Sequence, residues 1–257
     1  MARKIFLYLF LFLFISGVTP VLAMDQVQII EYEHKLMEVM GTDKVDSLVA
    51  NIAQLEKDLD KQEGLAYNLG KIRLGIYYHN LALNGFKMGY RGFAEKSFDT
   101  FRQIHEDPGC KPELRPIVLS YLGSSRAIMG DESNNPIDKI RFVQEGVAYL
   151  DEAVNKYKDY SYIPYFIRAN VCIALPDFFG KEKEAFKDYS SLEQWYQRTP
   201  ERIPAGIMSV VYFNLGDYHK KQRNLGKACD YWEKAEILDP DGEIGAQARE
   251  MLELFGG

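Results

Sequence analysis

The sequence predicts an all-α protein built from pairs of helices that recur along the chain. A segment at residues 209–242 has the pattern of two helices joined by a short turn, and weaker copies of that pattern precede it. Apolar residues also recur at helical spacing in residues 42–61 and 243–255. The 257 residues are 47% apolar and include 15 Phe, 17 Tyr and 2 Trp, which excludes a disordered chain and supplies a folded core.

The amino terminus has the plan of a secretory signal peptide. Arg3-Lys4 precedes an uncharged apolar run at Ile5–Val18, and Pro20 and a small-residue end at Ala23 follow. This pattern predicts that residues 1–23 are a signal peptide cleaved after Ala23, and that the mature chain is periplasmic or secreted. The alternative is an uncleaved membrane anchor, because the 19 residues before Met24 that carry no charge approach the length of a bilayer core of about 30 Å.

Residues 24–66 are expected to form a pair of helices ahead of the repeats. Asp25–Met40 and Thr42–Lys61 both have helical patterns. Thr42 is a suitable N-cap, because its hydroxyl can accept a hydrogen bond from a backbone N–H of the first turn. The second helix places six apolar side chains on one face, namely Val45, Leu48, Val49, Ile52, Leu55 and Leu59.

The clearest helix pair lies at residues 209–242. It carries, in order, Tyr212, Leu215, Gly216, His219, Ala228, Trp232, Ala235 and a closing Pro240. Small residues at Gly216 and Ala228 let the two helices cross closely, and the aromatic side chains fill the space beside the crossing. This pattern closely resembles a tetratricopeptide repeat, a helix-turn-helix unit of about 34 residues. Asn224 is expected to close the turn, because Asn tolerates the left-handed conformation.

Three earlier copies of the second-helix pattern are Ala94-Phe98-Phe101, Gly146-Leu150-Ala153 and Ala185-Tyr189-Leu192. Candidate first helices precede them at Leu74-Gly75, Leu122-Gly123 and Arg168-Ala169, with longer connections that predict inserted turns at 82–93, 130–142 and 175–183. The resemblance implies about four irregular repeats in residues 67–257, stacked as a solenoid. A closing helix at Glu243–Phe255 is expected to cover the last apolar face through Ile244, Ala248, Met251 and Leu252. The alternative is an irregular helical bundle.

The resemblance also implies a concave groove made by the first helix of each pair, along which a protein or peptide partner binds. The inward positions carried over to this sequence are Ile76, His79, Asn80, Phe166, Asn170, Ile173, Phe213, Asp217, Lys220 and Lys221. Asn can hold an extended backbone, Lys can meet a carboxylate, and apolar positions can receive side chains. The alternative for each position is an ordinary solvated face.

Three residues of the third unit are candidates for a pocket. Phe178 and Phe179 are adjacent aromatic residues in the third insert. One of them lines a pocket, or the pair fills the core between repeats. Arg168 stands where an apolar residue is expected, so it either pairs with a carboxylate such as Asp188 or binds a ligand.

Composition and motifs restrict the function. A net charge of −6 disfavours nucleic acid, which needs a positive face. Three scattered cysteines and four histidines give no metal spacing and no disulfide framework, so no metal, cofactor or catalytic residue is predicted. The leading hypothesis is an exported, non-enzymatic scaffold that binds a polypeptide in its groove. The alternatives are a periplasmic binding or transporter-accessory protein that holds a small apolar ligand in a pocket formed by the repeat inserts, and an enzyme with hidden paired carboxylates.

Overall fold

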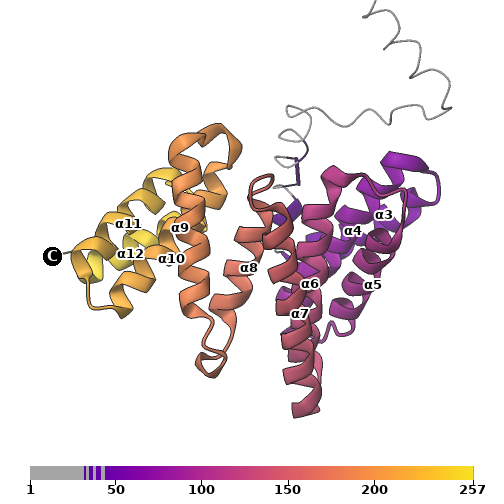
Figure 1. Ribbon diagram of the computed structural model, residues 1–257, viewed down its shortest axis with the longest axis horizontal. Helices are drawn as coiled ribbons and strands as arrows, with labels where there is room; N and C mark the ends of the chain where they lie inside the picture. The colour runs from indigo at the N-terminus through magenta and orange to yellow at the C-terminus, as the bar shows by residue number, and fades with distance from the viewer. Residues whose placement is uncertain (1–31, 33–34, 37–38, 42–43, 257) are drawn as a thin grey trace, which may run out of the picture.

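The computed structural model describes residues 32, 35–36, 39–41 and 44–256, and every regular element in these residues is helical (Figure 1). The all-α prediction is therefore confirmed. The expected signal segment and Thr42 lie outside the described residues, as does most of the expected helix at Asp25–Met40. Within the described part of the chain, no helix combines the length and the apolar composition of a membrane span.

Ten α-helices and four short 3₁₀ helices lie within residues 44–256. The α-helices are α3 (Val45–Leu59), α4 (Gly64–Gly85), α5 (Phe93–Glu106), α6 (Arg115–Glu132), α7 (Pro136–Tyr157), α8 (Ile163–Ala174), α9 (Glu182–Arg198), α10 (Ala205–Lys221), α11 (Leu225–Leu238) and α12 (Glu243–Phe255). The 3₁₀ helices are η1 (Phe86–Met88), η2 (Pro112–Leu114), η3 (Asp177–Phe179) and η4 (Pro200–Arg202).

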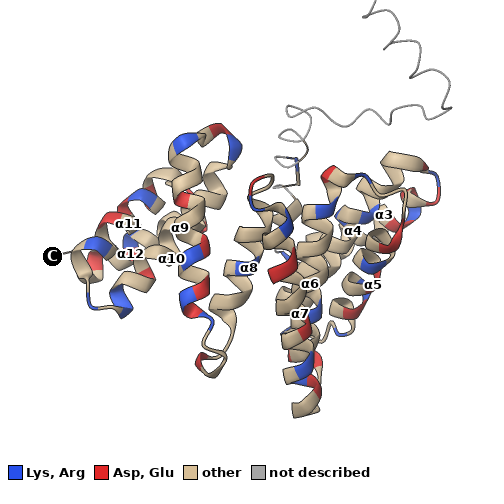
Figure 2. Cartoon of the chain, viewed as in Figure 1, with Lys and Arg blue, Asp and Glu red and all other residues tan. Residues whose placement is uncertain are grey.

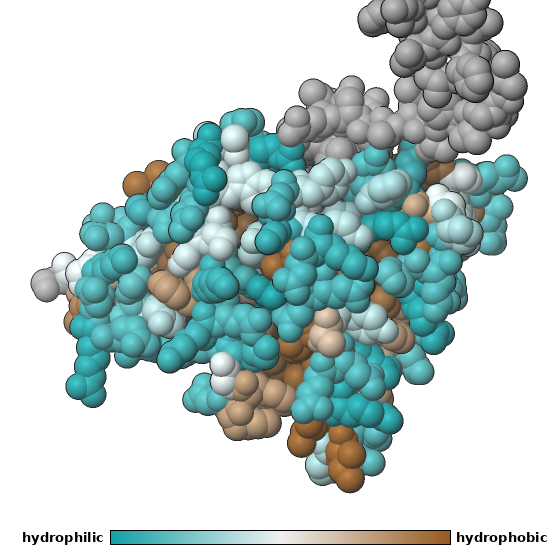
Figure 3. Space-filling model, viewed as in Figure 1, coloured by the Kyte–Doolittle hydropathy of each residue, from teal (hydrophilic) through white to brown (hydrophobic). Residues whose placement is uncertain are grey.

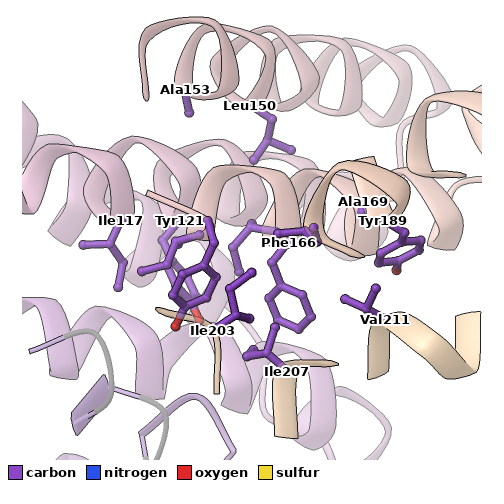
Figure 4. Packing of buried hydrophobic residues seen from close by; sticks show 14 of the residues in the cluster. Ile117, Tyr121, Leu150, Ala153, Phe166, Ala169, Tyr189, Ile203, Ile207 and Val211 are labelled. Atoms are coloured by element: carbon purple, nitrogen blue, oxygen red, sulfur yellow. The ribbon is translucent and has the colours of Figure 1, made fainter. Parts of the chain in front are cut away.

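The helices from α4 to α11 form four antiparallel pairs, α4–α5, α6–α7, α8–α9 and α10–α11, and α12 packs against α11 (Figure 1). One core cluster runs through all four pairs. In Figure 4, Phe166 of α8 points toward Ile207 of α10, so this core continues from the third pair into the fourth. A smaller cluster joins α3 to α4. Cys110, Cys172 and Cys229 are all free thiols.

The helices of a pair cross at the small residues that the sequence pattern selects. A Cβ on Gly216 would lie 2.5 Å from Nε1 of Trp232, and one on Gly75 would lie 2.7 Å from the ring of Phe101. In the second pair two glycines face each other, because a Cβ on Gly146 would lie 2.6 Å from the carbonyl oxygen of Gly123. These positions exclude any larger side chain, so the predicted close crossings are confirmed.

In the first two inserts, the turn between the helices is shorter than the sequence spacing predicts, because the flanking helices extend into the insert. α6 continues to Glu132 and α7 begins at Pro136, so most of insert 130–142 is helix. Asn135 explains the early start, because its side chain accepts a hydrogen bond from the backbone N–H of Ile137 at 3.0 Å and Pro136 suits the first helical position. Likewise α4 runs to Gly85, four residues into insert 82–93.

The turn between α10 and α11 uses a different residue from the one predicted. Arg223 has the left-handed conformation, with a φ of 60°, whereas Asn224 has a φ of −101°. Asn224 is the N-cap of α11 instead, and its side chain accepts a hydrogen bond from the backbone N–H of Lys227 at 3.3 Å. The expectation for Asn224 was wrong because two favourable roles of Asn, turn and cap, compete at adjacent positions.

The two ends of the described fold follow the predicted apolar faces. In α3, the side chains of Leu48, Ile52, Leu55 and Leu59 are buried. The bounds of α12 coincide with the predicted closing helix, with Ala248 fully buried and Ile244, Met251 and Leu252 half-buried against the core. The apolar pattern alone was sufficient to place both helices.

Candidate functional site

A cavity of about 1110 Å³ lies against the first helix of each pair. Side chains from α4, α6, α8, α10 and α12 line it, joined by residues of α7 and of the α8–α9 turn. The lining includes His79, Asn80, Leu83, Tyr121, Ser124, Ala127, Ile128, Ile140, Val143, Phe166, Ile167, Asn170, Val171, Phe178, Phe179, Gly206, Ile207, Ser209, Val210 and Ile244. Four charged residues, Asp131, Lys139, Asp239 and Glu243, complete the polar part of the lining, and α4, α6 and α8 are drawn mainly in the uncharged colour in Figure 2.

Six of the residues singled out from the sequence lie in this lining, namely His79, Asn80, Phe166, Asn170, Phe178 and Phe179. They come from two helix pairs, α4–α5 and α8–α9, so the fold brings together positions that are far apart in the sequence. The other seven, Ile76, Arg168, Ile173, Phe213, Asp217, Lys220 and Lys221, do not line the cavity.

Most of the residues outside the lining have other contacts. Ile76 is completely buried in the core. The Nζ of Lys220 lies 5.6 Å from the ring centre of Trp232, so Lys220 packs toward α11 and not into the predicted groove. Lys221 forms an ion pair with Glu182 of α9 at 2.7 Å. Extrapolation along α10 placed these lysines inward, whereas the cavity uses the first turns of α10, from Gly206 to Val210.

Arg168 is a structural cation. It forms two hydrogen bonds with Asp188, at 2.8 and 2.7 Å, and one with Asp151 at 2.9 Å. Burial opposes the charge of Arg168, but hydrogen bonds and the charge of Asp188 raise its pKa. Burial also raises the pKa of Asp188, which is only 1% exposed. The predicted pairing with Asp188 is confirmed, and it ties α7, α8 and α9 together.

An ordered polar group lies where α4 meets α6. Asn80 donates from Nδ2 to the backbone carbonyls of Val39 and Met40, at 3.2 and 3.1 Å, so its Oδ1 faces Nδ1 of His79 as an acceptor. We therefore assign the proton of His79 to Nδ1, which leaves Nε2 to accept from Ser124 Oγ at 2.8 Å. Ser124 uses its only proton in that bond, so it presents lone pairs to the cavity.

His79 is neutral in this arrangement. Burial lowers the pKa of His79 to about 4. Hydrogen bonds link Ser124, His79 and Asn80 in the order of a nucleophile, a base and an orienting group. A histidine with this pKa, however, is a weak base for a serine hydroxyl. Ser124 and His79 also lie inside helices, whose backbone N–H groups are used in helical hydrogen bonds and are not free to form an oxyanion site. The arrangement suits hydrogen bonding better than proton transfer.

Asn170 supplies the complementary donor. Its Oδ1 accepts a hydrogen bond from the hydroxyl of Tyr189 at 2.8 Å, which fixes the orientation of the amide. Within the described part of the chain no group accepts from its Nδ2, so two N–H groups are available at the cavity lining. The inner helices thus offer an acceptor at Ser124 and a donor at Asn170.

Phe178 and Phe179 lie in η3 at the edge of the cavity. Their ring centres are 4.4 Å apart, and Phe178 is 75% exposed. Gly180 ends η3 with a φ of 66°, a left-handed conformation that glycine adopts without strain. The interpretation in which this pair fills the core between repeats was therefore wrong, and the two rings extend the cavity wall instead.

Sequence reasoning missed the contribution of α6. The inward positions in α4 are four and five residues after Gly75, at His79 and Asn80. The same offsets from Gly123 give Ala127 and Ile128, and both line the cavity. The signal was present, because Gly123 was already recognised as the crossing residue of the second pair.

The described residues hold no group of His, Cys, Asp and Glu side chains that could bind a metal ion. Comparison of the chain with models of known protein families, with curated proteins and with solved structures finds no match in any of the three.

Proposed function

We propose that this protein is an exported, non-catalytic scaffold of tetratricopeptide-like helix pairs that holds an apolar segment of a partner polypeptide in its cavity. The observation that carries the proposal is the lining itself. It is mostly apolar, yet α4, α6, α8 and α10 each contribute an uncharged polar side chain, at His79, Ser124, Asn170 and Ser209. A polypeptide segment presents the same combination of apolar side chains and regularly spaced amide groups.

The crossings support the tetratricopeptide-like interpretation of the fold. Three of the four pairs meet at the small residue that the repeat pattern requires, Gly75, Gly123 or Gly216. In the remaining pair, α8–α9, Ala169 and Ala185 are both completely buried. The first helices of all four pairs then line one cavity. A shared crossing plan and a shared inner surface are what stacked repeats would produce.

The hydrogen-bonding groups support a polypeptide as the occupant. Ser124 presents lone pairs and Asn170 presents N–H groups, so a complementary occupant carries both a donor and an acceptor without a charge. Peptide bonds meet this requirement. A carboxylate would face the lone pairs of Ser124 and gain no matching charge from Asn170.

The test fills the cavity without disturbing the core. Gly206 is the second residue of α10 and lines the cavity, and a Cβ there would meet nothing within 4 Å. We expect Gly206→Tyr to weaken binding of a fluorescein-labelled apolar decapeptide, with blocked ends, by about tenfold or more in fluorescence anisotropy. Its melting temperature should stay close to that of the wild type.

The chain contains a matched control for this variant. Gly226 is the second residue of α11 and lies outside the cavity lining. A Cβ at this position would also meet nothing within 4 Å. Gly226→Tyr should therefore bind the same peptides as the wild type. Equal binding of the decapeptide by wild type and Gly206→Tyr, or no binding of the decapeptide to the wild type, would contradict the proposal.

A small apolar ligand is a second candidate, favoured by the participation of the inserts. Ile140, Phe178 and Phe179 add apolar surface to the lining beyond that of the helix pairs. Asn170→Leu separates the two candidates. It removes the amide donor, so it should weaken peptide binding but leave the affinity for a long-chain alcohol unchanged, because an alkyl chain needs no such partner.

A further inference from the structure

The turns within the four helix pairs gather along one edge of the molecule, the lower edge in Figure 1. We define the turn edge as the four connections α4–α5, α6–α7, α8–α9 and α10–α11. It includes the last helical turn before each connection and the first helical turns after it. All four first helices end there. The inserted residues of the first three pairs therefore lie on the same side of the protein.

Each turn of the turn edge exposes large apolar side chains. Ile137 is 76% exposed, Phe178 75% and Met88 64%, and Leu83, Ile140 and Leu225 are also exposed. Figure 3 shows apolar residues gathered at the lower edge, over the α6–α7 and α8–α9 turns. Scattered single apolar residues are ordinary on a protein surface, but their recurrence at four successive turns marks an interaction surface.

Each turn also carries an exposed cation. Lys87, Lys139, Lys183 and Arg223 belong to the four turns in order, and none of them forms an ion pair with another described residue. The chain as a whole is acidic, with a net charge of −6. The turn edge therefore combines exposed cations with protruding apolar side chains. It also carries the exposed carboxylates of Asp131 and Asp177, so its excess of positive charge lies in the α4–α5 and α10–α11 turns, where Lys87, Arg91, Arg223 and Lys227 are exposed.

We propose that the turn edge rests on the surface of a lipid bilayer that contains anionic lipids. The four turns form separate tips along one edge, and this arrangement suits a flat surface. Each tip can insert an apolar side chain into the bilayer while its Lys or Arg contacts a headgroup phosphate. A protein partner would more often cover one continuous patch with an apolar centre.

The cavity opens onto the same edge. Leu83, Ile140 and Phe178 are exposed members of the turn edge and also line the cavity. An apolar segment of a membrane-inserted partner would thus meet the cavity entrance at the level of the headgroups. Bilayer contact does not depend on the occupant, because it uses the tips and the cations, and so it stands or fails independently of the function proposed above.

The experiment is flotation of the full chain with phosphatidylcholine vesicles, with and without phosphatidylglycerol. Wild type should float with the anionic vesicles, and less so as salt rises, because salt screens the cations. Ile137→Glu combined with Phe178→Glu adds two negative charges at two tips and should reduce the floating fraction by about tenfold.

The matched control places the same two charges elsewhere. Tyr67 and Ile237 are exposed, at 36% and 74%, and lie outside the turn edge. Tyr67→Glu combined with Ile237→Glu should float like the wild type. Gly206→Tyr should do the same, because it fills the cavity and leaves the turn edge unchanged. Failure of the wild type to float, or an equal loss in both double variants, would overturn the proposal. A wild type that ignores vesicles but self-associates through Ile137 would point to a protein contact instead.

Discussion

The helix crossings and the turns of this protein follow opposite rules. At the crossings, Gly75, Gly123 and Gly216 meet their neighbours so closely that no larger side chain fits. At the turns, the connections differ in length and expose large apolar side chains such as Met88 and Phe178. The difference indicates that the crossings hold the fold, and the turns and the inner helix faces are the surfaces that we propose for binding.

The largest effect is expected at the last crossing. Trp232 is completely buried and fills the space beside Gly216. Trp232→Ala should therefore lower the free energy of unfolding by about 3 to 5 kcal/mol, through lost transfer energy and a cavity. Chemical denaturation followed by circular dichroism measures the change. A loss below about 1 kcal/mol, within the range of ordinary surface substitutions and their errors, would show that the crossing is not tightly packed.

The next effect concerns the ion pair that joins three helices. Arg168→Met leaves Asp188 buried and without its cation, which should cost about 3 kcal/mol or more. The double variant Arg168→Met/Asp188→Leu should recover most of that loss, because it removes the isolated charge. If the double variant is no more stable than the single variant, the isolated carboxylate of Asp188 is not the source of the loss, and the account of this ion pair is wrong.

His79 links the fold to pH. Its pKa in the folded protein, about 4, is below the unfolded value near 6.5, so the unfolded chain binds more protons between these values. The contribution of neutral His79 to the free energy of unfolding is fully present above pH 6.5. It is lost as the pH falls toward 4, and the total loss is roughly 3 kcal/mol. His79→Gln should have a flatter stability profile across this window, measured by urea denaturation at several pH values. His219, whose pKa burial also lowers, is present in both proteins and cancels in the difference.

The crossings were predictable because they depend on local spacing. Gly216 and Trp232 are a fixed number of residues apart in the repeat pattern, and only a small residue fits opposite a large one. The same reasoning placed α12, whose apolar face is visible in a single stretch of sequence. Interactions between residues close in sequence, or repeated at a fixed interval, leave a readable pattern.

The cavity was predicted only in part, because its position along each helix is a tertiary property. Of the residues predicted to face inward, His79, Asn80, Phe166 and Asn170 line the cavity, whereas Lys220 does not, since α10 contributes its first turns. Nothing in the sequence of α10 tells which end meets the cavity. The spacing of the inserts gave their length but not their conformation. The exception is the second insert, where Asn134–Ile137 predicts a turn followed by a helix that carries Ile140, Phe142 and Val143, and α7 does begin at Pro136.

One paired measurement tests the division between crossings and lining most directly. Gly146→Ala places a Cβ against the backbone of α6, and Gly206→Tyr places a ring in the cavity. The melting temperature and the decapeptide Kd are measured for both variants, at a temperature where both are folded. We predict that Gly146→Ala loses about 1 to 3 kcal/mol of stability with an unchanged Kd, whereas Gly206→Tyr melts normally and binds about tenfold more weakly. The reverse pattern, or two variants that change stability and affinity together, would contradict the account.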